Sequence, residues 1–200
     1  MSFRAVFSGP PDTVEESEFH RWYDDHLDEI LAHDGFLEAR RYSIEAVEGS
    51  AAPANYPFAS FYRIDGDPEA TNMVVRGAVS AGEIVHPSWF PLPRSSWAFY
   101  PLDEDELDAL PDSLIMVMAD SGAVADEALG GWYRQHVGAG PTPGREVLYR
   151  IVPSTVDEAA PPSTATMASL IVGDAPPDAT GVPGDVVVLR AVALGPGKTP

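Results

Sequence analysis

The segment FHRWYDDHLDEIL, residues 19–31, decides the fold, because it reads as an amphipathic helix and contains a motif that returns later in the chain. At 100° per residue, its apolar side chains recur at the i, i+3, i+4, i+7 spacing of one helix face. These side chains are Phe19, Trp22, Tyr23, Leu27, Ile30 and Leu31. His26 falls near the middle of that stripe, beside Tyr23, whereas the acidic opposite side is expected to face solvent. A histidine whose side chain points into a core either has a structural role, with its hydrogen bonds made there, or takes part in catalysis.

The motif occurs twice. WYDDHL at 22–27 returns as WYRQHV at 132–137, with the tryptophan, tyrosine and histidine in the same places. Strand-like runs surround the two copies in the same order, at 2–8, 38–44, 58–64 and 96–102 in the first half and at 113–120, 146–152, 166–172 and 185–194 in the second. The first half therefore predicts the order β-α-β-β-α-β. The second half has no room for the last helix, and paired glycines weaken its remaining one.

Local signals predict where the helices of the first half begin and end. Asp12 or Thr13 is placed to cap the first helix, with a glutamate following as in a capping box. Gly35 is placed to end that helix. The second helix is expected over 68–82, since it would begin with a proline and end near a glycine.

This order of elements predicts the α+β class. A β-α-β-β-α-β unit forms an antiparallel sheet with helices on one face, the ferredoxin-like arrangement, and its bare face must be covered. We expect a first ferredoxin-like repeat over 1–102 and a second, degenerate repeat over 113–194, packed sheet to sheet. The acidic stretch 103–112 is expected to link them, and 153–164 and the tail 195–200 are expected to be mobile.

Composition excludes several classes of partner. The 200 residues carry 31 acidic and 12 basic side chains, a net charge of −19, which disfavours nucleic acid and anionic membrane surfaces. The absence of cysteine excludes disulfides, thiolate metal sites and a cysteine nucleophile. No apolar run is long enough for a signal peptide or a membrane span, so a cytoplasmic protein is expected.

The motif W-Y-x-x-H-L at 22–27, followed by DGFLEARRY at 34–42, resembles the dimeric α/β-barrel superfamily, especially its EthD-like branch. The chain is similar to the fused form, in which two halves of one chain make the barrel that other members build as homodimers. The resemblance implies a pocket in each half, between the sheet and its helices. It also implies chemistry with few or no cofactors on small aromatic or polyketide-like molecules, such as isomerisation, cyclisation, dehydration or metal-free oxygenation.

His26 and Tyr23 are the catalytic candidates, since the resemblance places them where the polar groups of that pocket would lie. A neutral imidazole moves a proton α to a carbonyl, and a phenol donates to the developing enolate oxygen. Burial keeps a histidine neutral near pH 7. We therefore expect a cofactor-independent lyase or isomerase in which Tyr23 is the hydrogen-bonding partner of His26. His136 in the degenerate half is expected to be structural.

Two alternatives remain open. His26 could instead organise the core of a non-catalytic barrel that binds small molecules, and a cavity touching both His26 and Tyr23 would favour the enzyme. The superfamily also contains cofactor-free and haem-linked oxygenases, although the sequence singles out no axial ligand. Neither His20 with Asp24 nor Glu29 with His33 has an evident third ligand, so no metal site is expected.

The expected partner is a small hydrophobic or aromatic ligand, with a second copy of the chain as a further candidate. Arg40 and Arg41 lie on a strand, so only one of them faces each side of the sheet, and one is a candidate for binding a carboxylate. The proline-rich stretch 83–96 is expected to cover the pocket mouth or to pack over the end of the sheet. The ligand-binding candidates are Trp22, Arg41, His86, Trp89 and Phe90.

Overall fold

The computed structural model describes residues 1–48, 56–90, 94–102, 107–119, 146–153, 167–172 and 186–200. Within these ranges the chain forms two helices and eight strands. In chain order they are β1 (Ser2–Ser8), α1 (Glu16–Leu31), β2 (Phe36–Glu48), β3 (Phe58–Ile64), α2 (Pro68–Ala81), β4 (Arg94–Pro101), β5 (Ser113–Ala119), β6 (Glu146–Pro153), β7 (Met167–Val172) and β8 (Val186–Ala193). The order β-α-β-β-α-β predicted for the first half is therefore observed. The helix expected around 132–137 lies outside the described residues.

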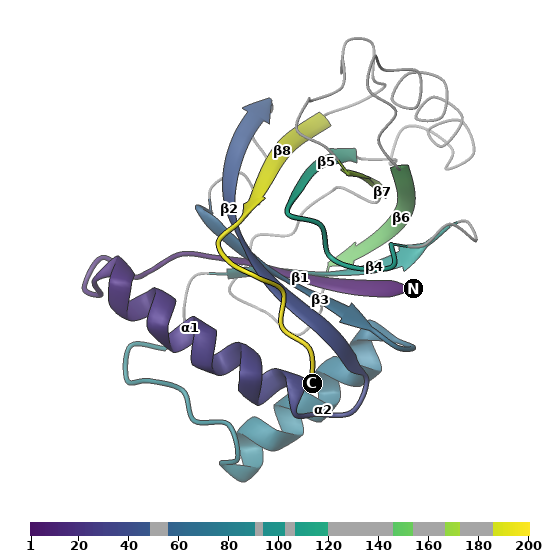
Figure 1. Cartoon of the computed structure of the whole chain (residues 1–200). Coiled ribbons are helices and arrows are strands. Elements are labelled where there is room, and N and C mark those ends of the chain that lie inside the picture. The colour runs from purple at the N-terminus through teal and green to yellow at the C-terminus, as the bar shows by residue number, and fades with distance from the viewer. Residues whose placement is uncertain (49–55, 91–93, 103–106, 120–145, 154–166, 173–185) are drawn as a thin grey trace.

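The eight strands close into one antiparallel barrel in the order β1-β3-β2-β8-β5-β7-β6-β4 (Figure 1). The four strands of the first half are neighbours, and so are the four of the second. The two groups are joined by backbone hydrogen bonds at both edges, where β2 pairs with β8 and β4 pairs with β6. The architecture is thus α+β, with a curled antiparallel sheet and two helices.

Side chains alternate between the inside and the outside of the barrel. In β1, Phe3 and Phe7 point into the barrel and are fully buried, whereas Arg4 and Val6 point outward. Aromatic side chains of neighbouring strands fill the interior, and Phe7 packs edge-on against Phe61 and Trp97. Strands of the second half complete the same cluster with Leu114, Met116, Met118, Tyr149, Ile151, Leu170 and Leu189. The interior of the barrel is therefore a packed core.

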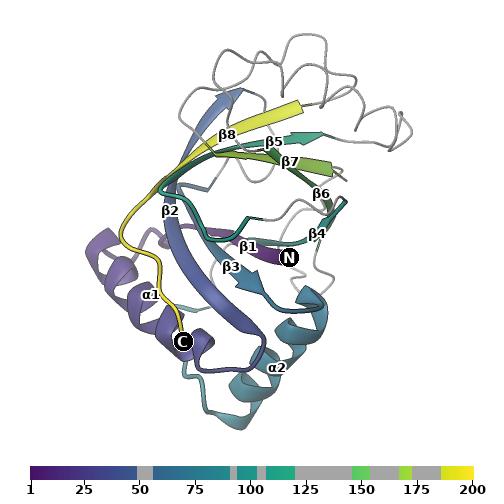
Figure 2. The same cartoon turned by 45° about the vertical axis from the view of Figure 1, so that its right-hand side comes forward.

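Both helices lie on the outer face of the first half of the barrel, and β5, β7 and β8 lie on the far side of it (Figure 2). The apolar stripe of α1 packs there as its periodicity predicts, with Phe19, Tyr23, Leu27, Ile30 and Leu31 buried. Between the helices and this sheet face a second apolar cluster forms, which includes Phe36, Tyr62, Ile64 and Ala78. In the described part of the chain no helix is long and apolar enough to cross a membrane.

Local signals predict the start and end of α2 but not the start of α1. α2 matches its prediction, since it starts at Pro68, the Asp67 side chain accepts a hydrogen bond from the Glu69 amide, and Gly82 ends it in the left-handed conformation. The capping prediction for α1 is wrong, because the N-cap is Glu15 and makes no side-chain hydrogen bond. The stretch before it is a turn, in which the Val14 amide donates to the Pro11 carbonyl.

The end of α1 also differs from its prediction. The C-cap is Ala32, three residues before the expected glycine. Gly35 instead takes a φ of 93° in the turn that leads into β2, a conformation that favours glycine. Its carbonyl accepts from the Asp65 amide, so the turn is tied to the end of β3.

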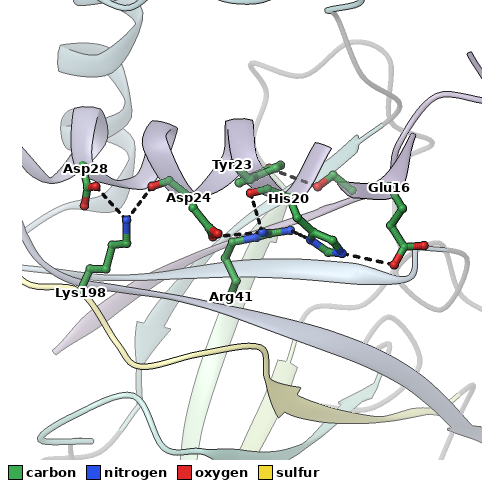
Figure 3. Close-up of polar contacts among 8 residues, drawn as sticks. Glu16, His20, Tyr23, Asp24, Asp28, Arg41 and Lys198 are labelled. Atoms are coloured by element: carbon green, nitrogen blue, oxygen red, sulfur yellow. Dashed lines mark hydrogen bonds and ion pairs between the residues drawn. The ribbon is translucent and has the colours of Figure 1, made fainter. Parts of the chain in front are cut away.

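The C-terminal tail is held in place, which corrects the expectation that 195–200 is mobile. Lys198 and Ala39 exchange two backbone hydrogen bonds of 2.8 and 2.9 Å, which add a short bridge to β2. The Lys198 amine donates to the Asp24 carbonyl at 2.7 Å and to the Asp28 carboxylate at 2.8 Å (Figure 3). The tail therefore ties α1 to the sheet.

The described end of the acidic stretch 103–112 is also packed rather than free. Leu107 and Leu110 are buried in the barrel core. The Leu110 amide donates to the Glu38 carboxylate at 3.0 Å, and the Tyr42 hydroxyl donates to the Pro111 carbonyl at 2.8 Å. This segment therefore closes one end of the barrel between β4 and β5.

Truncation of residues 196–200 is expected to lower the free energy of unfolding by roughly 1–3 kcal/mol, since it removes two backbone hydrogen bonds and both amine contacts. Lys198→Ala alone is expected to cost less than about 1 kcal/mol, because its ion pair with Asp28 is partly exposed. Urea unfolding curves of the full-length protein and both variants measure this. Removal of residues 199–200 alone is the control, and a loss as large as that from the longer truncation would contradict the bridging role of Lys198.

Candidate functional site

A cavity of about 360 Å³ lies between the outer sheet face, the two helices and the segment that follows α2. Its walls combine apolar and aromatic side chains with polar ones. α1 contributes Trp22, Tyr23 and His26. The sheet contributes side chains from β1, β3 and β4, and α2 contributes the face that turns toward the sheet. The cavity thus lies in the place that the superfamily resemblance implies for the first half.

His26 is held by a carboxylate and by aromatic rings. Its Nδ1 atom lies 3.3 Å from the Glu29 carboxylate, one turn further along α1. Its ring stacks on Trp22, with centroids 4.7 Å apart and planes at 14°, and lies 5.8 Å from the His86 ring. Since a carboxylate only accepts, Nδ1 carries the hydrogen in a neutral His26 and Nε2 keeps its lone pair.

Burial lowers the pKa of His26 below its ordinary value of 6.5. Glu29 opposes this shift, and the positive charges of His86 and Arg94 add to it. His26 is therefore neutral at pH 7 and able to accept a proton. A cavity-lining imidazole of this kind is suited to general-base chemistry near neutral pH.

Tyr23 lines the same cavity but does not bond to His26. The Ser8 hydroxyl donates to the Tyr23 oxygen at 3.1 Å, which leaves the phenol's own hydrogen for another acceptor. The His26 ring faces Tyr23 edge-on, with centroids 6.0 Å apart. Glu29 therefore takes the place expected for Tyr23 as the hydrogen-bonding partner of His26.

The segment after α2 supplies one wall of the cavity. His86 and Phe90 line it, and their rings stack with centroids 3.8 Å apart. Trp89 does not line it but packs edge-on against Trp22 at 5.1 Å, so it supports a wall rather than forming one. The Arg94 guanidinium lies 4.7 Å from the centroid of the Phe90 ring. Burial and the charge of Arg94 lower the pKa of His86.

Arg41 lies outside this cavity. It is buried behind Tyr23 and donates to the Asp24 carboxylate and the His20 carbonyl, each at 3.2 Å (Figure 3). It also lies 2.7 Å from His20 Nδ1, and because a guanidinium only donates, His20 must accept there and direct its Nε2 toward Glu16. Arg41 thus connects β2 with α1.

Arg40 and Arg41 point to opposite sides of the sheet, as strand parity predicts. Arg40 donates to the Leu110 carbonyl at 2.7 Å and pairs with Asp112 at the end of the barrel. Neither arginine reaches the cavity. The predicted solvated flank of α1 is also partly engaged, since Asp24 pairs with Arg41.

The polar residues of the cavity that the sequence analysis does not identify include Arg4, Asn72, Arg76 and Arg94. Asn72 and Arg76 are one turn apart on α2, and the outward parity of Arg4 in β1 is readable from its apolar neighbours. The chain has 12 basic side chains, and three of them, all arginines, line this one cavity.

Two other predictions concern histidines. In the described ranges, no three histidine, aspartate or glutamate side chains are grouped as a metal site would require. Glu29 bonds to His26 and not to His33. The second copy of the motif, with Trp132, Tyr133 and His136, lies outside the described residues.

No protein-family model matches the sequence. No curated protein matches it either. Among solved structures, the chain is similar to the crystal structure of a "Putative Chlorite dismutase", with a TM-score of 0.51 and 11% sequence identity over 97% of this chain and 95% of that one. At this identity the likeness shows the fold alone.

Proposed function

We propose that this protein is a cofactor-independent lyase or isomerase that moves a proton α to the carbonyl of a small aromatic or polyketide-like compound. The observation that carries the proposal is the cavity that touches both His26 and Tyr23, with Glu29 bonded to the imidazole. A dry, filled core around His26 would instead have favoured a structural histidine. The EthD-like branch remains part of this proposal.

The reaction uses the two polar groups of α1 in turn. Nε2 of neutral His26 takes the proton from the carbon next to the carbonyl, and Glu29 stabilises the imidazolium that forms. The electron pair moves onto the carbonyl oxygen, where the Tyr23 hydroxyl donates a hydrogen bond. An isomerase then returns the proton from His26 to a different carbon. A lyase instead expels a leaving group from the β carbon, and His26 protonates that group.

A haem-linked oxygenase is the alternative that this cavity does not fit. A porphyrin needs a broad flat slot beside its axial histidine. Here His26 is stacked on Trp22 and His86 on Phe90. The volume of about 360 Å³ lies near the lower end of the roughly 300–1,000 Å³ typical of small-molecule sites. We therefore propose that the reaction in this cavity uses no haem.

We also propose that the second half of the chain is a ferredoxin-like repeat without its second helix. The strand order supports this, because each half has its first strand between its third and fourth and its third strand beside its second. Its role would be to cover the inner face of the first sheet. The cavity of the first half needs no helix from the second.

Proton exchange in D₂O tests the proposed chemistry. We expect the full-length protein to accelerate loss of the α-proton NMR signal of at least one member of a panel of aryl ketones, lactones and aryl keto acids, by about 10²-fold or more over buffer. Thermal shift on the same panel reports binding separately. If compounds stabilise the protein but none undergoes proton exchange, the result contradicts the enzyme and favours a non-catalytic barrel that binds small molecules.

A further inference from the structure

The cavity is cationic in a strongly acidic protein. The chain has a net charge of −19, yet three arginines and no aspartate or glutamate are among the described residues that line the cavity. Of these arginines, Arg4 forms an ion pair with Glu69 at 3.8 Å, which is not a lining residue. Positively charged side chains on the walls favour a negatively charged ligand.

Asn72 provides a second, independent indication. It lies on α2, is 8% exposed and lines the cavity. Its side-chain amide nitrogen has no hydrogen-bond partner in the structure. Buried polar groups are nearly always paired, so an amide donor in a cavity wall with no protein partner is available to an acceptor within the cavity.

The other two arginines line the same cavity. Arg76 is one turn further along α2, on the exposed rim of the cavity. Arg94 lies over the Phe90 ring, and Phe90 in turn stacks on His86. The cationic groups are therefore next to an aromatic wall, formed by Trp22 as well as Phe90 and His86.

We infer that the ligand of this cavity is an aromatic carboxylate, with its carboxylate bound by Arg94 and Asn72 and its ring against Trp22 and Phe90. Arg76 at the rim attracts the anion as it enters. This inference rests on the proposed function only in that both use the same cavity. In combination with it, the substrate is an aryl acid whose carbonyl is reached by His26 and Tyr23.

Benzoate and benzamide test the inference, because they have the same shape and differ in charge. Isothermal titration of the full-length protein is expected to give benzoate an affinity higher than that of benzamide by about tenfold or more. Arg94→Gln is expected to remove this preference. Asn72→Asp places a carboxylate in the cavity wall and is expected to weaken benzoate binding by about tenfold or more, with benzamide little affected.

Two further variants keep the result interpretable. Arg190→Gln removes one positive charge from β8, where Arg190 pairs with Glu45 away from the cavity, and should retain the preference. Arg76→Gln changes an exposed side chain and should lower benzoate affinity even if the buried variants fail to fold. Raising the salt concentration should weaken benzoate binding alone.

The inference is overturned if wild-type protein binds both probes equally, if benzoate shows no binding at millimolar concentration, or if Arg94→Gln and Arg76→Gln both retain the wild-type preference. These readouts are separate from the exchange assay. A carboxylate preference without proton exchange would keep the inference and remove the proposed reaction. Exchange on neutral ketones without any carboxylate preference would do the reverse.

Discussion

His26→Gln is expected to lower the rate of proton exchange by about 10²–10⁴-fold, because it removes the only group of the proposed pair that can accept the proton. Most of the stability should remain. The His26 side chain is 12% exposed, and a glutamine amide can still donate to Glu29. Exchange rates by NMR and thermal unfolding of the same samples measure the two effects. Retention of the wild-type rate would remove His26 from the mechanism.

Two other histidines serve as controls. His33→Gln alters a side chain that follows α1 and does not line the cavity, so exchange should be unchanged. His136→Gln, in the second copy of the motif, should leave exchange unchanged and cost roughly 1–3 kcal/mol of stability if its hydrogen-bonding partner is left buried. If His26→Gln and His136→Gln lose the same amount of stability and neither changes the exchange rate, both histidines are structural.

Glu29→Gln should give an intermediate rate, since it keeps the hydrogen bond and removes the charge that stabilises the imidazolium.

The pH dependence of exchange follows from the pKa of His26, which lies below 6.5 because the ring is buried. Only the neutral ring accepts a proton, so the rate should be level above pH 6.5 and fall as acid protonates His26. The same shift acts on stability. The unfolded chain binds a proton here at a higher pH than the folded one, so this contribution is present above pH 6.5 and is lost as the pH falls through the folded pKa. Both trends should be absent from His26→Gln.

Residues 1–104 expressed alone are expected to form a homodimer or to aggregate. In the complete chain, large aromatic side chains of the first sheet are buried against the second half, namely Phe3, Phe7, Phe61, Trp97 and Phe99. Without that half, this face and the free edges of β2 and β4 would meet water. Light scattering after size-exclusion chromatography gives the mass. A stable monomer would count against the proposed cover by a second repeat.

Paired substitutions in the fragment distinguish a specific dimer from nonspecific association. Phe61→Asp places a charge on the inner face and should prevent a dimer built through it. Val74→Asp makes the same kind of change on the exposed side of α2, where Val74 is 46% exposed, and should leave the dimer intact. A dimer lost in Val74→Asp but kept in Phe61→Asp would place the interface on the helices.

Much of the first half could be predicted because its information is local. The stripe on α1, the alternation in β1 and the boundaries of α2 follow from periodicity and from Pro68 and Gly82. The start of α1 could not be predicted from capping residues, since contacts of its buried face outweigh a cap. The packing of the tail and of residues 107–112 depends on long-range contacts such as that between Lys198 and Ala39.

The part of the candidate site that was predictable lies on α1 and on the segment after α2, where His86 and Phe90 line the cavity. His26 and Tyr23 share a face of α1, and Glu29 lies at the i+3 position from His26, so its contact was within reach of the same reasoning. Asn72 and Arg94 could not be identified, because that requires knowing which face of α2 covers the sheet and where β4 begins. The sequence predicts the strand that carries Arg41. It does not predict the bond from Arg41 to Asp24, because that bond depends on how α1 packs against β2.

The pairing of β2 with β8 has a consequence for the order of folding. The bond from the Ser43 hydroxyl to the Val192 carbonyl joins residues 149 positions apart, and the barrel closes only through such contacts. Loop closure over this distance must precede the stabilisation that it brings, which is typical of slow, millisecond-to-second folding. During synthesis β8 emerges after the other described strands, so the outer edge of β2 has no strand to pair with until residues 186–193 have left the ribosome. An unpaired strand edge is a site of aggregation, so the growing chain is exposed to this hazard at β2 until β8 pairs with it.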